Sequence, residues 1–122
     1  MKTKLAVACL TLFLFGALAA HAATLRVVNV ETPDVAAYVK ALEQGQQLLK
    51  TKGSPAVLRV WKARFAGSAA GTVVASVEYP NLEALAKDDA LMKSDAELKS
   101  WVAGLDRVRK IVSDSIYEEL KP

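Results

Sequence analysis

The chain contains one cysteine and one histidine, Cys9 and His21, and both lie near its N-terminus. Residues 1–22 have the features of a secretory signal peptide, so we expect the mature chain to contain neither residue type. Without cysteine the mature chain has no disulfide, thiol redox centre or cysteine nucleophile. Without histidine it has no histidine-based triad, no histidine zinc ligand and no histidine-ligated haem.

The N-terminal segment carries the three parts of an export signal. Lys2 and Lys4 precede a charge-free apolar run over residues 5–19, and "AHA" at 20–22 matches a small-residue cleavage site. The run is shorter than the roughly 20 residues that span a bilayer. This pattern predicts cleavage after Ala22 and a periplasmic or secreted protein without a membrane anchor. A retained anchor is the alternative.

Little net charge remains after the predicted cleavage. Removing 22 residues from the 122 leaves 100, and the 16 basic residues fall to 14 against 13 acidic ones because Lys2 and Lys4 leave. A net charge near +1 does not predict a basic face, so nucleic acid is not an expected partner. A length of 100 residues predicts one domain over residues 23–122.

The remaining groups do not form a recognisable catalytic or metal motif. The adjacent pairs Asp88-Asp89 and Glu118-Glu119 lack the alternate-residue spacing of a calcium loop, and we interpret them as solvated charge. No serine stands in a Ser-x-x-Lys arrangement, so nucleophilic catalysis is not expected. We expect no metal and no other cofactor.

Hydrophobic patterns and turn residues predict two strand–helix–strand passes. The expected strands are 24–32, 56–65, 72–79 and 109–120; one helix lies between the first two, and a helical region that breaks near Lys93 lies between the last two. Thr32, Asn81 and Ser94 are the expected helix N-caps. Gly45 weakens the first helix or marks a close packing contact.

This order predicts an α+β fold. A β-α-β-β-α-β chain with right-handed crossovers forms the ferredoxin-like arrangement, in which both helices cover one face of a four-stranded antiparallel sheet. The other face is then open. In the strand over 56–65, Leu58 and Val60 share one face and Trp61 lies on the opposite face. Bulky apolar groups therefore occur on both faces, which is typical of an interface or a binding cavity.

The stretches "RVWKARFAG", "GTVVASVEYPNLEAL" and "KSDAELKSWV" resemble the dimeric α+β barrel superfamily, in particular its NIPSNAP-like and antibiotic-biosynthesis-monooxygenase-like branches. The resemblance covers essentially the whole of 23–122. It implies that two ferredoxin-like subunits place their open faces together, with a pocket between each sheet and the partner. A homodimer is therefore expected, and a monomeric ferredoxin-like domain is the alternative.

Five residues are candidates for lining a ligand pocket: Asn29, Arg59, Trp61, Ser76 and Glu78. Asparagine is uncommon inside a strand, and the resemblance implies that Asn29 orients substrate or oxygen; the alternative is a residue satisfied by backbone or water. Trp61 either stacks on a flat ligand or belongs to the core or to an interface. Arg59 holds an anion, or pairs with Glu78 as a structural ion pair.

These observations leave three functions open. The first is a non-enzymatic protein that binds a small apolar or aromatic molecule, or that only dimerises. The second is a cofactor-free monooxygenase with Asn29 and Trp61 at a small aromatic substrate. The third, haem handling, ranks last. The catalytic members of the monooxygenase-like branch that the chain resembles rely on a histidine, and the expected mature chain has none.

Overall fold

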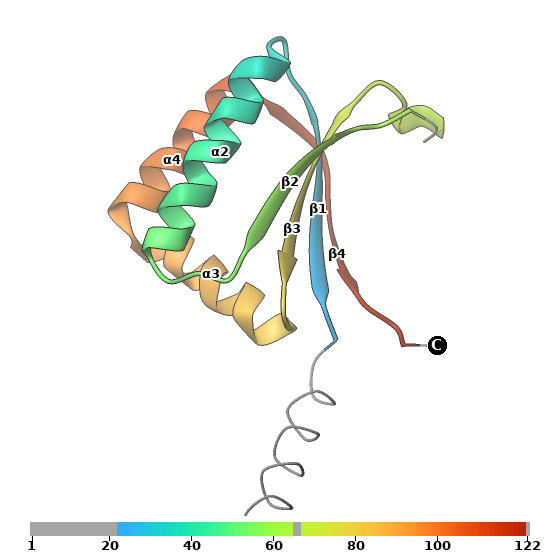
Figure 1. Ribbon diagram of the computed structural model, residues 1–122. Helices are drawn as coiled ribbons and strands as arrows, with labels where there is room; N and C mark the ends of the chain where they lie inside the picture. The colour runs from blue at the N-terminus through green and yellow to red at the C-terminus, as the bar shows by residue number, and fades with distance from the viewer. Residues whose placement is uncertain (1–21, 65–66, 122) are drawn as a thin grey trace, which may run out of the picture.

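A computed structural model describes residues 22–64 and 67–121 of the chain, so the predicted signal peptide lies outside the described residues apart from Ala22. The elements follow the expected order, with the second helical region split in two (Figure 1). They are β1 (Thr24–Glu31), α2 (Val35–Thr51), β2 (Val57–Lys62), a short 3-10 turn (Gly67–Ala69), β3 (Val73–Tyr79), α3 (Leu82–Ser94), α4 (Ala96–Val108) and β4 (Lys110–Glu118).

The four strands form one antiparallel sheet in the order β2-β3-β1-β4. Two strands adjacent in sequence, β1 and β2, are separated in the sheet by β3, because α2 crosses over between them. Figure 1 shows α2 and α4 side by side over one face of the sheet, and none of the described elements covers the other face. The predicted α+β fold is therefore confirmed. Among the described residues no helix is long and apolar enough to cross a membrane.

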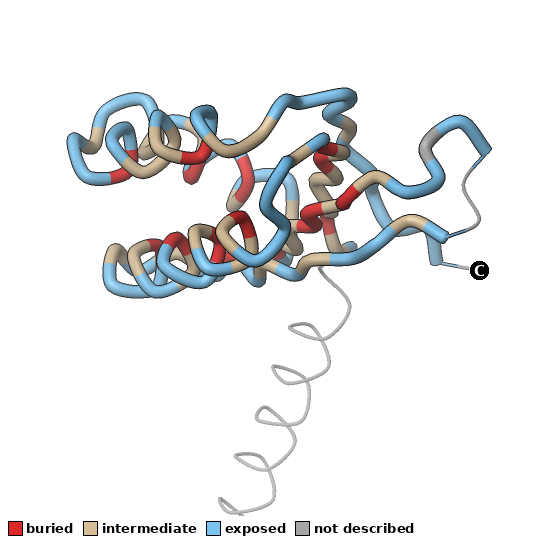
Figure 2. Tube along the Cα trace, turned by 90° about the horizontal axis from the view of Figure 1, so that it is seen from above, coloured by how far each residue is buried: buried red, intermediate tan, exposed pale blue. Residues whose placement is uncertain are grey.

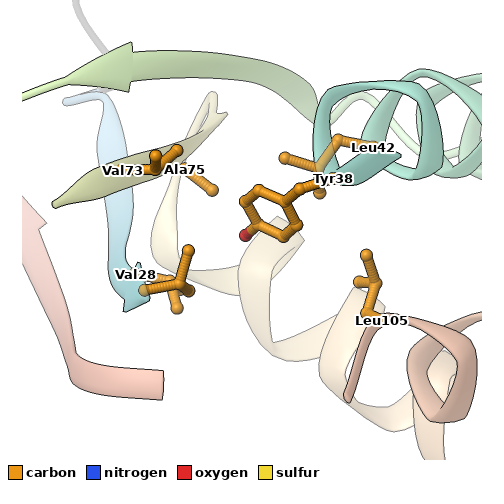
Figure 3. Close-up of a cluster of buried hydrophobic side chains, with 7 residues drawn as sticks. Val28, Tyr38, Leu42, Val73, Ala75 and Leu105 are labelled. Carbon is orange, nitrogen blue, oxygen red and sulfur yellow. The ribbon is translucent and has the colours of Figure 1, made fainter. Parts of the chain in front are cut away.

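The core lies between the helices and the sheet. One cluster joins the N-terminal half of α2 and the C-terminal end of α4 to β1 and β3 (Figure 3). It consists of Val28, Val30, Tyr38, Leu42, Val73, Ala75 and Leu105. A second cluster lies toward α3: Leu49, Ala56, Tyr79, Leu85 and Leu98. Figure 2 shows the buried positions on the inward sides of the helices and on the central strands, whereas the outer positions are exposed.

Carboxylate and amide side chains start the helices. Asp34 accepts a hydrogen bond from the Ala37 amide at 3.0 Å, and Asn81 accepts one from the Ala84 amide at 2.8 Å. The predicted cap at Asn81 is confirmed, and the cap at Thr32 is wrong. The Thr32 hydroxyl instead donates to the Val108 carbonyl at 2.6 Å, so it ties the start of α2 to the end of α4.

The break between α3 and α4 is at Asp95, close to the predicted position. Asp95 ends α3 and caps α4 by accepting from the Leu98 amide at 3.1 Å, so the prediction of Ser94 as the cap is wrong. Lys52, just after α2, contacts Asp95 at 3.0 Å and Glu97 at 2.9 Å. The Leu98 amide and then Lys52 lower the pKa of Asp95 below its ordinary value.

Gly45 marks the close contact that the sequence suggests. A Cβ atom added at Gly45 would lie 1.9 Å from Cζ2 of Trp101 on α4, so only glycine fits here. The Trp101 indole also donates to the Ala41 carbonyl at 2.8 Å. The indole therefore lies directly against the backbone of α2, which brings the two helices together.

One edge of the sheet is covered by a side chain of α2. The Gln46 amide donates to the Ala56 carbonyl at 2.9 Å and accepts from the Leu58 amide at 2.7 Å. A strand neighbour would bond an edge strand in the same way. Gln46 therefore occupies part of the exposed edge of β2 and limits its pairing with other chains.

The interpretation of Asp88 as solvated charge is wrong. Asp88 is buried and accepts a hydrogen bond from the Ser54 hydroxyl, which in turn accepts from the Ala56 amide at 3.1 Å. Tyr79 is buried nearby. Its burial, and then the charge of Asp88, raise the pKa of Tyr79 well above its ordinary value. These groups form a polar network that joins the end of α2 to α3.

Candidate functional site

The sheet register places all five candidate residues on the open face. Arg59 pairs with Ser76 across β2 and β3, and Val57 pairs with Glu78 in the next row of the same face. The remaining row consists of Trp61, Val74 and Asn29, which are cross-strand neighbours on β2, β3 and β1. Side chains alternate between the faces of a strand, so these residues point away from the helices. Their role in ligand binding stays a prediction.

Trp61 and Ser76 form the best-defined contact of this face. The Trp61 indole donates to the Ser76 hydroxyl at 2.8 Å. Ser76 is buried, whereas Trp61 is 54% exposed. The hydrogen bond therefore fixes the orientation of a large aromatic ring that projects from the sheet.

Arg59 and Glu78 form an ion pair at 3.5 Å, with side chains that are 54% and 44% exposed. Such an exposed pair contributes about 0 to 1 kcal/mol to stability. The structural alternative considered for Arg59 is therefore seen in the structure. In this conformation the guanidinium is occupied by a neighbouring carboxylate.

Asn29 lies next to an irregularity in the sheet. It pairs with Ser113, whereas Val30 pairs with Ile111, so Val112 of β4 is an extra residue. Such a bulge bends its strand and increases the local twist. Asn29 is two strands from Trp61, which is roughly 10 Å at the usual strand spacing. The two candidates thus share a face without touching.

Large apolar side chains project from the open face at both of its edges. Val57 and Trp61 on β2 are 41% and 54% exposed, and Tyr117 on β4 is 57% exposed. Large exposed apolar groups on a structured surface typically mark an interaction site. The open face therefore exposes large apolar side chains beside its polar ones.

A cavity of about 130 Å³ lies on the other side of the sheet, between it and the helices. Its apolar walls come from both layers, and they include Val28, Ala75 and Val77 of the sheet and Leu42, Trp101 and Leu105 of the helices. Several of these side chains are visible in Figure 3, where they converge from β1, β3, α2 and α4. None of the five open-face candidates lines this cavity.

Three charged residues, Arg26, Arg109 and Asp114, also line the cavity. Arg26 is fully paired: it contacts Asp114 with two nitrogens, at 3.0 and 2.7 Å, and Asp89 at 2.9 Å. The Arg26 hydrogen bond holds the pKa of Asp114 below its ordinary value. This charged group contributes Arg26 and Asp114 to the cavity wall and connects β1, β4 and α3.

Arg109 differs from Arg26. Its side chain is only 11% exposed, and its nearest carboxylate is the largely exposed Asp106, at 3.4 Å. One guanidinium nitrogen lies 3.5 Å from the Tyr38 hydroxyl. Among the side-chain atoms of the described residues, Arg109 Nε is the buried polar atom without a hydrogen-bond partner. The cavity is therefore apolar with one incompletely satisfied cation.

Sequence reasoning did not find this cavity. Its lining residues are the inward positions of ordinary amphipathic elements, and the void between them depends on how far the helices stand from the sheet. Arg109 follows α4 as a charged residue in a polar stretch, so its burial was not predictable from the pattern. Within residues 22–64 and 67–121 no group of three or more His, Cys, Asp or Glu side chains is arranged to hold a metal.

The fold has counterparts among solved structures. A NIPSNAP family protein from Agrobacterium tumefaciens str. C58 superposes with a TM-score of 0.60 at 12% identity, over 84% of this chain and 93% of that chain. A conserved protein of unknown function from Bacteroides thetaiotaomicron VPI-5482, described as a possible oxidoreductase, superposes with a TM-score of 0.51 at 14% identity, over 82% and 100%.

These similarities define the fold: an α+β fold like that of the NIPSNAP family protein. The sequence matches no family model and no curated protein. At such low identity the similarity extends to the fold alone, and the function must be argued from the chain's own residues.

Proposed function

We propose that this protein is exported, dimerises through its open sheet face, and binds a small apolar or aromatic molecule without transforming it. The observation that carries the binding role is the cavity between sheet and helices. The cavity has a volume of about 130 Å³, is partly open to solvent and has mainly apolar walls with a few polar groups, which supports a role in binding a small molecule.

The cavity volume limits the ligand. An engineered protein cavity of about 150 Å³ accommodates benzene. The cavity here is slightly smaller, at about 130 Å³, so it suits a single ring or a short branched chain.

Native mass spectrometry of the freshly purified protein tests the binding role. We expect a small-molecule adduct that is lost on denaturation. Val102→Phe places a larger side chain in the cavity wall and should abolish the adduct. Val35→Phe, on an exposed part of α2, is the matched control and should retain it. A wild-type protein without an adduct, which also fails to bind added single-ring compounds, would refute the proposal.

The contacts of Ala23 support the export proposal. The Ala23 amide donates to a Glu119 carboxylate oxygen at 3.3 Å, and the Glu119 amide donates to the Ala23 carbonyl at 2.8 Å. Cleavage after Ala22 would leave β1 whole and turn the Ala23 amide into a charged amine beside Glu119. We expect cell fractionation to place a chain beginning at Ala23 outside the cytoplasm. An intact chain in the cytoplasmic fraction would contradict export.

A cofactor-free oxygenase is the second candidate, because Asn29 and Trp61 lie in one row of the open face. The solved structure described as a possible oxidoreductase has a related fold. A substrate on this face would be enclosed only by a second subunit. Oxygen uptake with a small phenol that exceeds the buffer rate, and that falls in Asn29→Ala, would favour the oxygenase over the binding protein.

A further inference from the structure

The guanidinium of Arg109 is the unusual component of the cavity wall. Burying a cation without sufficient partners is unfavourable, and proteins normally pair such groups. Arg109 has an Nε–H group without an acceptor among the described residues and one long contact to the exposed Asp106. Its two terminal nitrogens make only long contacts, at 3.4 Å to Asp106 and 3.5 Å to the Tyr38 hydroxyl, so the guanidinium keeps hydrogen-bonding capacity for an anion in the cavity that it lines.

The other cation of the cavity, Arg26, is less suited to binding a ligand anion. Arg26 already contacts Asp89 and Asp114, so two carboxylates surround one guanidinium. An anion bound next to Arg26 would be repelled by these two carboxylates. At the Arg109 end the nearest carboxylate belongs to Asp106, which is 60% exposed and therefore screened by water. Asp114 also interacts electrostatically with Arg109, but its hydrogen bonds go to Arg26, so Arg109 is the cation of the cavity that lacks a close carboxylate of its own.

We infer, on the basis of the proposed binding function, that the cavity ligand is a small aromatic or branched aliphatic carboxylate whose carboxylate is bound by Arg109. The planar guanidinium presents N–H donors in a geometry that matches a carboxylate. The ring or chain of the ligand then lies against Val28, Leu42, Ala75 and Leu105, whose side chains Figure 3 shows converging from both layers. The Tyr38 hydroxyl, 3.5 Å from Arg109, helps to hold the guanidinium in place.

Benzoate is a suitable probe because a single ring matches the cavity volume. Benzyl alcohol is the neutral control, since it has a similar shape without the negative charge. Calorimetric titration should show benzoate binding at least about tenfold more tightly than benzyl alcohol, since a hydrogen bond to a charged group contributes about 1.5–3 kcal/mol. This comparison uses the wild-type protein and does not depend on the folding of a variant.

Arg109→Gln removes the charge and should weaken benzoate binding about 10- to 100-fold while benzyl alcohol binding changes little. Arg107→Gln, two residues earlier and exposed, is the matched control and should bind benzoate like the wild type. The two tryptophans report the location, because Trp101 lines the cavity and Trp61 lies on the open face. Benzoate should shift the indole NMR signal of Trp101 and leave that of Trp61 unchanged.

Other outcomes separate the two proposals. If benzoate and benzyl alcohol bind equally, or if Arg109→Gln binds benzoate like the wild type, the carboxylate specificity is refuted and the binding function stands. If neither compound shifts the Trp101 signal and the purified protein carries no other ligand, both proposals are refuted.

Discussion

At the residue scale, Gly45 shows how one position sets the distance between two helices. Glycine in the middle of a helix costs roughly 1 kcal/mol relative to alanine. Here the absence of a side chain lets the Trp101 ring approach the backbone of α2, where its indole N–H finds the Ala41 carbonyl. Packing and one partly buried hydrogen bond therefore outweigh helix propensity at this site.

Substitution at Gly45 tests this balance. Gly45→Ala should lower the free energy of unfolding by about 1–3 kcal/mol, because the new methyl group overlaps the Trp101 ring and forces it to move. Urea denaturation followed by circular dichroism measures the change. Gly104→Ala in α4 is the control: a Cβ atom added there would have no neighbour within 4 Å, so it should stabilise the protein by about 0.5–1 kcal/mol. Equal effects at both positions would contradict the packing interpretation.

At the scale of elements, the junction between α3 and α4 depends on the charge of Asp95. Its folded-state pKa lies below the ordinary value of 3.8, because it accepts a hydrogen bond from the Leu98 amide and pairs with Lys52. A lowered pKa means that the ionised form stabilises the fold. This contribution is complete well above pH 3.8 and is lost as the pH falls through the folded-state pKa.

Asp95→Asn should therefore reduce the acid sensitivity of the protein. Asparagine can still cap α4 through its side-chain oxygen, but it does not titrate and does not form the ion pair with Lys52. We expect the variant to be less stable than the wild type at pH 7, and the difference to shrink toward pH 2. Denaturation curves at both pH values measure it. Glu43→Gln, at an exposed carboxylate, is the control. If the stability difference between Asp95→Asn and the wild type were the same at pH 7 and pH 2, the stabilising role of the Asp95 charge would be contradicted.

The edge of β2 gives a second test at this scale. Gln46→Ala removes both hydrogen bonds from the α2 side chain to the backbone of the strand and should destabilise the protein by roughly 1–2 kcal/mol. The Leu58 amide should then exchange with solvent faster. Gln47→Ala, at the next and exposed position, should change neither quantity. Unchanged exchange at Leu58 in Gln46→Ala would show that β3 alone orders the strand.

At the scale of the whole molecule, the open face is the surface that we propose for dimerisation. Trp61→Glu should weaken the dimer at least about 30-fold, since tryptophan is enriched among the interface residues whose loss costs about 2 kcal/mol or more. Light scattering across a dilution series should then detect monomers. Leu82→Glu, on an equally apolar exposed position of α3, should leave the dimer intact. A wild-type protein that is monomeric at micromolar concentration would refute dimerisation.

The periodic features of the fold were predictable, and the features that depend on distance were not. Alternation along β2 correctly placed Trp61 on the face opposite to Leu58 and Val60, because side chains in a strand must alternate. The caps at Asp34 and Asp95 were each displaced from the predicted residue, since neighbouring Thr, Ser and Asp all favour that role. Arg109 was missed because no pattern encodes the gap between two layers.

The sheet is a single layer, and β3 contributes to both of its faces. Ala75 and Val77 line the cavity, while Ser76 between them holds the Trp61 ring on the open face. A ligand in the cavity and a second subunit on the open face would therefore be separated by the thickness of one strand. If the ligand or the second subunit displaces β3, ligand binding and dimerisation are coupled. By reciprocity, the factor by which dimerisation changes the ligand affinity equals the factor by which the ligand changes the dimer affinity.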